Sequence, residues 1–437
     1  MPLCSFDLGR IELTDHKQPE LVRAIGRWTL AGLVLNGIIG GGIFGVPSLV
    51  AAQLGRASPW ACLIAAVGVG IIIACFAEVG SRFREAGGVY LYARESFGRF
   101  AGIQIAWVAW LARLTAVAAN SNLFVSYLAV LWAPATKPIP RLIILTALIG
   151  ILVAVNYRGV TGGAQISSIF VVAKLLPLSL FVLLGILFLR GAITATAPLA
   201  PGGAWLDGVL VLVYTFGGFE TALISMGEAK DPQRDVPFSL FVGLGLTTLL
   251  FTGIQIVVVT ALAAPETTDR PLAAAAAQFL GPAGAILMTA GALASIYGNL
   301  ASNILNSPRL TYTLADRGDF PKSLAAVHPR YRTPHVSIVV FGLMVWALAA
   351  AGSFRWNVTL SAVARLLTYG ATCAALIAMR KKAPGREAFH LPAGNIVAML
   401  GIAFAVVLVT RMDMSGVIII GITVAIALGN WFWARRS

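Results

Sequence analysis

Charged residues are scarce in this chain. Asp, Glu, Lys and Arg make up only 11% of its 437 residues, whereas apolar side chains make up 58%. A soluble domain carries about 25% charged residues. The composition therefore excludes an ordinary soluble domain and indicates an all-α polytopic membrane protein.

Cysteine is also scarce, and the four cysteines have no paired spacing. Cys62, Cys75 and Cys373 lie within apolar runs, and Cys4 precedes them. This pattern predicts small packing residues and indicates neither a disulfide framework nor a metal site. The sequence contains no His/Cys cluster, nucleophile elbow or phosphate loop, so we expect no metal, no cofactor and no enzyme activity.

The net charge of +14 comes from basic residues in short clusters between the apolar runs. They form no basic surface interleaved with aromatics, so we expect no nucleic-acid partner. Lysines and arginines favour the cytoplasmic side of a membrane protein. Their distribution predicts a multi-pass protein of the cytoplasmic membrane (inner or plasma) with both termini cytoplasmic. Residues 1–27 show no cleavable signal pattern and are predicted to be a cytoplasmic segment, followed by one transporter domain over 28–437.

The apolar runs predict twelve transmembrane helices, of which several exceed about 25 residues and the fourth is short. Their approximate limits are 28–54, 57–80, 100–132, 141–156, 164–189, 205–228, 237–264, 282–315, 336–352, 357–379, 395–410 and 415–433.

A glycine-rich break interrupts the first span near the expected midplane. Ile38–Pro47 contains three consecutive glycines, Gly40, Gly41 and Gly42. Glycine is a poor helix former, and broken backbone cannot face lipid without hydrogen-bond partners. Close packing of small residues is the alternative. The break predicts a solute site inside the membrane.

A second glycine break lies in the sixth span, at Tyr214–Glu220. Because the two broken spans are five apart, each begins a five-helix unit, and the second unit enters the membrane inverted. The units cover about 28–190 and 205–380, with two further helices over about 395–433. Broken helices at matching positions of two inverted halves indicate a transporter site.

Several motifs occur together along nearly the whole chain. They are Gly40–Pro47, Glu85–Tyr90, Gly217–Glu220 with Glu228–Pro232, Ser307–Pro321 and His328–Pro334. In this order and spacing the chain resembles the amino acid–polyamine–organocation (APC) superfamily of permeases. The resemblance implies a LeuT-like fold: a 5+5 inverted repeat with broken helices 1 and 6, plus two C-terminal helices.

The resemblance also implies a substrate site at the two breaks. The amides after Ile38, around Gly40, Gly41 and Gly42, would receive the α-carboxylate of an amino acid at the positive end of a half-helix. Carbonyls near Tyr214 and Gly217 would receive its α-ammonium group. Tyr214 aligns with the aromatic residue that closes over substrate in this family; simple packing within the bundle is the alternative for this side chain.

The pocket for the substrate side chain is expected to combine apolar and polar residues. Val117 would offer apolar contact, together with Ala112 and Ala116. Arg113 would either pair an acidic substrate or brace Glu220 and helix carbonyls, and we favour bracing. Asn303 replaces the tryptophan found in many bacterial relatives, which would enlarge or wet the pocket.

Two ionisable residues within spans are candidates for coupling and gating. Lys174 is charged and lies halfway along span 5, where a charge is costly; snorkelling to the headgroups is the alternative. In related permeases such a lysine occupies the region that holds a cation in sodium-driven relatives, and it could exchange a proton. Glu220 could carry a proton or pair structurally with an amide or arginine. Arg309 and Arg365 are interpreted as structural or gate ion-pair residues, and Glu78 and Glu228 as inner-gate or capping groups.

Together these features predict a secondary active transporter that moves neutral amino acids by alternating access. Transport would be sodium-independent, and either proton-coupled or exchanging. An exchanger of acidic amino acids, or of an amino acid against an amine, is the alternative within this class. A membrane-embedded amino acid sensor without transport is the alternative from another class.

Overall fold

The structure, a computed structural model, describes residues 26–83, 88–159, 163–189, 201–220, 223, 229–382 and 389–435, with side chains in the 163–189 segment described from Lys174 onward. Residues 1–25 of the predicted N-terminal segment, Glu85 of the second motif and Glu228 lie outside the described residues.

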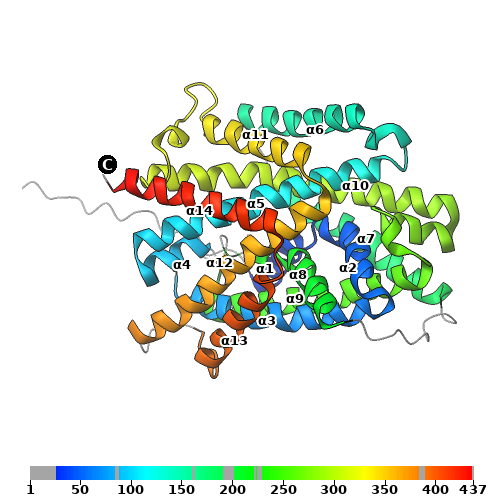
Figure 1. Cartoon of the computed structure of the whole chain (residues 1–437), viewed down its shortest axis with the longest axis horizontal. Coiled ribbons are helices and arrows are strands. Elements are labelled where there is room, and N and C mark those ends of the chain that lie inside the picture. The colour runs from blue at the N-terminus through cyan, green and yellow to red at the C-terminus, as the bar shows by residue number, and fades with distance from the viewer. Residues whose placement is uncertain are drawn as a thin grey trace, which may run out of the picture.

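Helices dominate the described chain, and many of them lie side by side (Figure 1). Their bounds are α1 (Arg27–Ile38), α2 (Gly42–Leu54), α3 (Ser58–Ser81), α4 (Gly88–Phe97), α5 (Arg99–Leu128), α6 (Pro138–Arg158), α7 (Gly163–Phe188), α8 (Gly202–Phe216), α9 (Pro232–Ala261), α10 (Pro271–Asp316), α11 (His335–Ala351), α12 (Phe354–Lys382), α13 (Gly394–Val409) and α14 (Met414–Ala434).

Within the described residues, seven helical stretches are long and apolar enough to cross a membrane. Four shorter apolar helices accompany them, at Lys174–Phe188, Gly202–Phe216, His335–Ala351 and Gly394–Val409. The protein is therefore an integral membrane protein. Each of the predicted apolar runs overlaps a helix or a pair of half-helices, whereas their crossing of a bilayer twelve times stays a prediction.

Two helices differ from the sequence-based expectation. The amphipathic helix α4 lies in a stretch where no helix was predicted, before the expected start of span 3. Helix α10 begins at Pro271 instead of near residue 282, because the chain is already helical before its kink at Gly281. Gly281 has φ 65°, directly before Pro282, and the two residues together interrupt the helical geometry.

Both predicted breaks are present. Helix α1 ends at Ile38 and α2 starts at Gly42, so Ile39, Gly40 and Gly41 connect two half-helices. Helix α8 ends at Phe216, and the chain continues through Gly217 in extended geometry and Gly218 at φ 109°. The left-handed φ of Gly218 favours glycine at this point.

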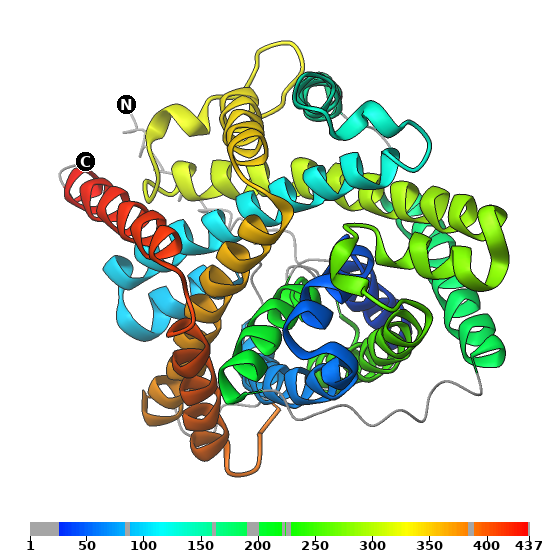
Figure 2. The ribbon, with the colours of Figure 1, turned by 45° about the vertical axis from the view of Figure 1, so that its right-hand side comes forward.

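The broken helices lie together within the bundle. Figure 2 shows α1, α2, α3, α8 and α9 gathered into one group, with α5 and α12 running past it and α6 and α11 at the periphery. Contacts between α2 and α8, and between α1 and α9, join members of this group. This arrangement places the two glycine breaks in the interior of the protein.

Candidate functional site

The two breaks meet backbone to backbone. A Cβ atom on Gly218 would overlap the carbonyl oxygen of Gly37 at the end of α1. A Cβ atom on Gly42 would lie 3.1 Å from the Tyr214 ring and 3.2 Å from Cα of Thr215. Side chains at these two glycines would therefore separate the breaks, which explains the need for glycine in both spans.

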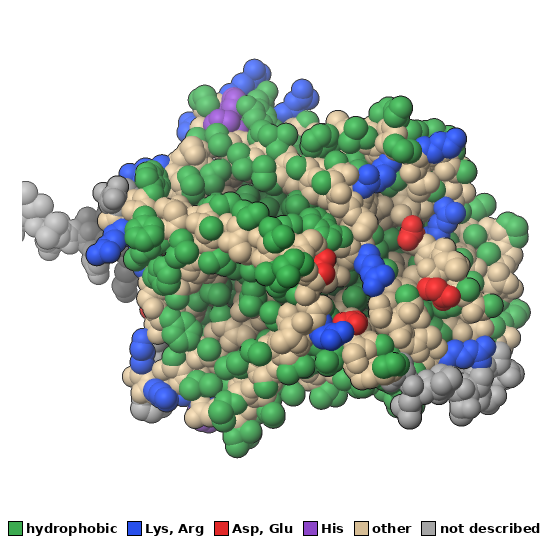
Figure 3. All heavy atoms as spheres, viewed as in Figure 1, with side chains coloured by type: hydrophobic (Ala, Val, Ile, Leu, Met, Phe, Trp, Pro, Cys, Tyr) green, Lys and Arg blue, Asp and Glu red, His purple; other side chains and the backbone are tan. Residues whose placement is uncertain are grey.

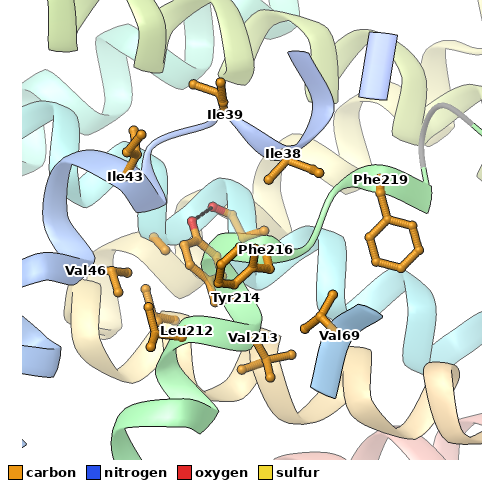
Figure 4. Packing of buried hydrophobic residues seen from close by; sticks show 14 of the residues in the cluster. Ile38, Ile39, Ile43, Val46, Val69, Leu212, Val213, Tyr214, Phe216 and Phe219 are labelled. Carbon is orange, nitrogen blue, oxygen red and sulfur yellow. Dashed lines mark hydrogen bonds between the residues drawn. The ribbon is translucent and has the colours of Figure 1, made fainter. Parts of the chain in front are cut away.

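The start of α2 presents unpaired backbone donors. The amides of Gly41, Gly42 and Ile43 have no hydrogen-bond acceptor among the residues that the structure describes. All three residues are buried. Buried donors at the positive end of a 13-residue helix are suited to receive an anionic group. Figure 4 shows the connection through Ile39, with Ile38 and Ile43 on the flanking half-helices.

A polar network runs from Tyr214 across three helices. The Tyr214 hydroxyl donates to Asn120 Oδ1 on α5 at 2.8 Å, and Asn120 Nδ2 donates to Asn299 Oδ1 on α10 at 2.8 Å. Asn303 Nδ2 donates to the same Asn299 oxygen at 3.0 Å. The structure thus links two predicted site residues, Tyr214 and Asn303, through two asparagines.

This asparagine pair lies against the first glycine break. A Cβ atom on Gly40 would come 2.9 Å from Asn299 Nδ2, and one on Gly41 would overlap Asn120 Oδ1. The sequence analysis missed both asparagines. Their signal was available, since each is a buried or half-buried amide within an apolar span, where polar side chains are costly unless paired.

Tyr214 is buried, with 6% of its surface exposed, and its hydroxyl also lies 3.4 Å from the Ala116 carbonyl oxygen (Figure 4). Val117, the next residue of α5, is fully buried in the apolar core. Directly after Tyr214, the hydroxyl of Thr215 is buried and has no partner among the described residues. This free hydroxyl, 3.3 Å from a Cβ built on Gly42, is a further polar group at the break.

Lys174 reaches the first break from α7. Its ammonium donates to Asn36 Oδ1 at 3.0 Å and to the Ile39 carbonyl oxygen at 3.3 Å. The side chain is buried, so snorkelling to the headgroups is wrong. Both hydrogen bonds described for this ammonium therefore go to α1 and the connection that follows it. Among the described residues, Lys174 has no carboxylate within ion-pair distance.

Glu220 is paired structurally. Its Oε1 lies 2.5 Å from Arg365 Nη1 of α12, and its Oε2 accepts from the Tyr369 hydroxyl at 3.0 Å and from the Gly218 amide at 2.8 Å. The prediction of an ion pair for Arg365 is confirmed. The arginine also crosses the second break, since a Cβ atom on Gly217 would overlap its guanidinium.

Arg113 makes no hydrogen bond and no ion pair with the described residues, but it faces the charges of Glu220 and Arg365. Any bracing of Glu220 by Arg113 is therefore electrostatic, and Arg365 supplies the direct contact. Arg309 lies exposed and donates only to the Leu305 carbonyl oxygen of its own helix, so the predicted ion pair is not present among the described residues.

Two carboxylates hold one end of the bundle together. Glu78, fully buried at the end of α3, pairs with Arg82 at 2.7 Å and with Arg380 of α12 at 2.5 Å, and accepts from the Leu391 amide at 2.9 Å. It joins three segments instead of capping one helix.

Asp319 follows α10 and is fully buried. Its carboxylate accepts from the Tyr90 hydroxyl of α4 and pairs with Arg99 at 2.7 Å and Arg94 at 3.2 Å. Burial, followed by the hydrogen bond to Asp319, raises the pKa of the Tyr90 hydroxyl, so Tyr90 remains a neutral donor. These contacts close the same end of the protein as the Glu78 cluster, next to α4 and α12.

Discontinuous membrane helices whose ends surround buried, unpaired donors define a class of protein, the membrane permeases with a central solute site. The sequence model of the amino acid permease family matches residues 25–434 of this chain. The chain belongs to that family, which confirms the resemblance to APC permeases drawn from its motifs.

Individual relatives are similar over most of their length. The serine/threonine exchanger of Bacillus subtilis (strain 168) is 24% identical over 88% of this chain and 89% of its own. The methylthioribose transporter of the same organism is 24% identical over 95% of this chain and 94% of its own. The large neutral amino acids transporter small subunit 2 of Mus musculus is 27% identical over 83% of this chain and 71% of its own.

Proposed function

We propose that this protein is a secondary active transporter that carries neutral amino acids across the membrane by alternating access. The observation that carries the proposal is the set of buried, unpaired amides at Gly41, Gly42 and Ile43. They offer a site for an α-carboxylate. The adjoining end of α8, a helix C-terminus with partial negative charge, offers a site for an α-ammonium group.

The charges around the breaks favour a substrate with an uncharged side chain. Glu220 is neutralised by Arg365 at 2.5 Å, so the described residues at the breaks leave no free carboxylate to receive a cationic side chain. Beside the two cationic groups, Lys174 and Arg113, the polar side chains at the breaks are neutral: Asn120, Asn299, Asn303 and Thr215. They suit small polar or apolar side chains, and one of the similar proteins named above is a serine/threonine exchanger.

Transport is proposed to be independent of sodium, with a proton or a second amino acid as the coupled species. Lys174 supports this, because its ammonium already occupies the region beside the Ile39 carbonyl and Asn36 that would otherwise suit a metal cation. Asp, Glu and carbonyl oxygens are the usual ligands of such cations. A buried ammonium beside these oxygens repels a metal cation.

The architecture that we propose for the cycle is the inverted repeat. Residues 28–190 and 205–380 would form the two units, residues 395–433 two added helices, and both termini would face the cytoplasm. Rocking of the α1–α3, α8 and α9 group against the remaining helices would expose the breaks to each side in turn. The contact between Glu78 of α3 and Arg380 of α12 joins the two groups and would then have to open.

Counterflow into proteoliposomes tests this function. Vesicles preloaded with one unlabelled neutral amino acid, such as serine, should accumulate the labelled form transiently, with or without sodium. Repeating the assay with neutral, acidic and cationic amino acids identifies the class of substrate. Binding without counterflow would support the sensor alternative, and a strict sodium requirement would contradict the assignment of Lys174.

A further inference from the structure

A cavity lies where the end of α6 meets the chain that leads into α11. Its volume is about 380 Å³, and it is lined by Gly150, Val153, Ala154, Tyr157, Arg158 and Tyr331. None of these residues belongs to the site described above. The motif His328–Pro334, which forms one of its walls through Tyr331, has no role in the proposed transport cycle.

The lining of this cavity changes from apolar to cationic along α6. The apolar part is formed by Gly150, Val153 and Ala154. The polar part follows one to two turns later, at Tyr157 and Arg158, so that Gly150 and Arg158 are about 12 Å apart along the helix axis. Beside them Ile151 is 58% exposed and Val155 is 50% exposed. Helix α6 lies at the edge of the bundle (Figure 2).

The opposite wall is a preformed loop. His328 N donates to the Thr333 carbonyl oxygen at 2.9 Å, and the Thr333 hydroxyl donates to the Tyr157 carbonyl oxygen at 2.8 Å. The Tyr157 and His328 rings are 5.3 Å apart, and those of His328 and Tyr331 are 4.8 Å apart. Hydrogen bonds and aromatic ring contacts thus hold the loop against the end of α6, so that binding a ligand requires little further ordering of the loop.

Positive charge gathers at this wall without a counter-charge. Arg158, Arg330 and Arg332 are exposed, and none has a carboxylate within 4.0 Å among the described residues. The Arg330 guanidinium lies 5.6 Å from the Tyr331 ring centroid, which holds it beside the cavity. His335 Nδ1 is buried there without a partner. Figure 3 shows Lys and Arg side chains around histidine at the upper edge of this face.

We propose that this cavity binds a phospholipid with an anionic headgroup. The headgroup phosphate would lie at Arg158 and the Tyr157 and Tyr331 hydroxyls, and one acyl chain would follow the apolar wall from Ala154 to Gly150. Arginine and tyrosine at the headgroup level beside an apolar groove match the chemistry of such a lipid at each end. In the topology predicted from the sequence this end is cytoplasmic, the side where basic pockets meet anionic lipid.

Native mass spectrometry of the purified full-length protein tests this site. The protein is titrated in detergent with phosphatidylglycerol or with phosphatidylcholine of the same acyl chains. We expect one phosphatidylglycerol adduct, retained at least tenfold more than phosphatidylcholine. The Arg158→Gln/Arg330→Gln variant should reduce that adduct about tenfold, whereas Arg355→Gln, an exposed arginine elsewhere, should leave it unchanged.

A second variant probes the acyl chain without changing any charge. A side chain at Gly150 would enter open space within the cavity, since nothing lies within 4 Å of a Cβ built there. Gly150→Leu should therefore fold normally and lose the adduct, whereas Gly421→Leu, also in open space on α14, should keep it. Millimolar inorganic phosphate should not displace the lipid.

Three outcomes would overturn the proposal. Equal retention of the two lipids would remove the headgroup preference, and an unchanged adduct in the double arginine variant would remove the assigned site. Displacement by phosphate with no effect of Gly150→Leu would assign the cavity to a soluble anion. Because the readout is lipid binding, none of these outcomes depends on the transport assay.

Discussion

The guanidinium of Arg365 lies 2.5 Å from the carboxylate of Glu220, although 145 residues separate them in the chain. This pair joins α12 to the segment directly after the break in α8. The same carboxylate accepts from the Gly218 amide, so the ion pair fixes the extended backbone at the second break. Its position makes Glu220 a support of the broken helix, in addition to any part it has in coupling.

Breaking this pair should destabilise the protein strongly. Arg365→Ala leaves a largely buried carboxylate without its cation, and the loss of one partner of a buried pair costs about 3–5 kcal/mol. We expect a clearly lower apparent melting temperature in detergent. The double variant Glu220→Gln/Arg365→Met should recover much of the loss, because neither charge is then buried unpaired. Equal stability of wild type and Arg365→Ala would contradict the structural role.

The glycine break should not tolerate a side chain at Gly42. A Cβ atom there already lies 3.1 Å from the Tyr214 ring, so Gly42→Leu should abolish amino acid uptake by filling the space beside the free amides. The matched control is Gly32→Leu, which enters open space on α1 and should retain uptake. Both variants are compared at equal amounts of inserted, monodisperse protein, and normal uptake by Gly42→Leu would refute the carboxylate site.

These sites differ in how far the sequence could reveal them. Three consecutive glycines are a local signal, so the first break could be located from the sequence alone. The Tyr214–Asn120–Asn299 network and the Glu220–Arg365 pair could not, because each depends on which faces of distant helices meet. Arg113 and Arg365 are both arginines within predicted spans, and only the packing of α12 against α8 decides which of them contacts Glu220.

Boundaries show the same limit. Span 8 was predicted to begin near residue 282, but this position is a kink within a helix that starts at Pro271. Glycine and proline in a sequence indicate an interruption, and they do not reveal whether the residues before it are also helical. Helix α4 escaped prediction because its mixed apolar and charged sequence is that of an amphipathic surface helix, and the search for long apolar runs passes over such a segment.

Lys174 should matter for transport and not for folding. Lys174→Ala removes the ammonium that contacts Asn36 and the Ile39 carbonyl, and with it a charge that is costly to bury. We expect uptake to fall at least tenfold while the melting temperature stays equal or rises. The control Lys137→Ala changes an exposed lysine and should transport normally. Full activity of Lys174→Ala in sodium-free proteoliposomes would exclude the coupling role.

The Tyr214 hydroxyl should set affinity more than rate. Tyr214→Phe keeps the ring against Gly42 but removes the donor to Asn120 Oδ1, and an unsatisfied buried acceptor costs about 1–3 kcal/mol. If the network orients the substrate, KM for uptake should rise about tenfold with the maximum rate within twofold. Tyr297→Phe, at a 41% exposed tyrosine, serves as the control. An unchanged KM in Tyr214→Phe would separate the network from substrate binding.

Substrate charge gives the last test. Because Arg365 holds Glu220, a lysine or arginine substrate would find no free carboxylate among the described residues at the breaks and would face the charge of Arg113 across a medium of low dielectric. Neutral amino acids should therefore inhibit labelled uptake strongly, and arginine should not inhibit it. Arg113→Gln should leave inhibition by neutral amino acids unchanged. Strong inhibition by arginine alone would overturn this assignment, and glutamate inhibition that disappears in Arg113→Gln would make an acidic amino acid the substrate.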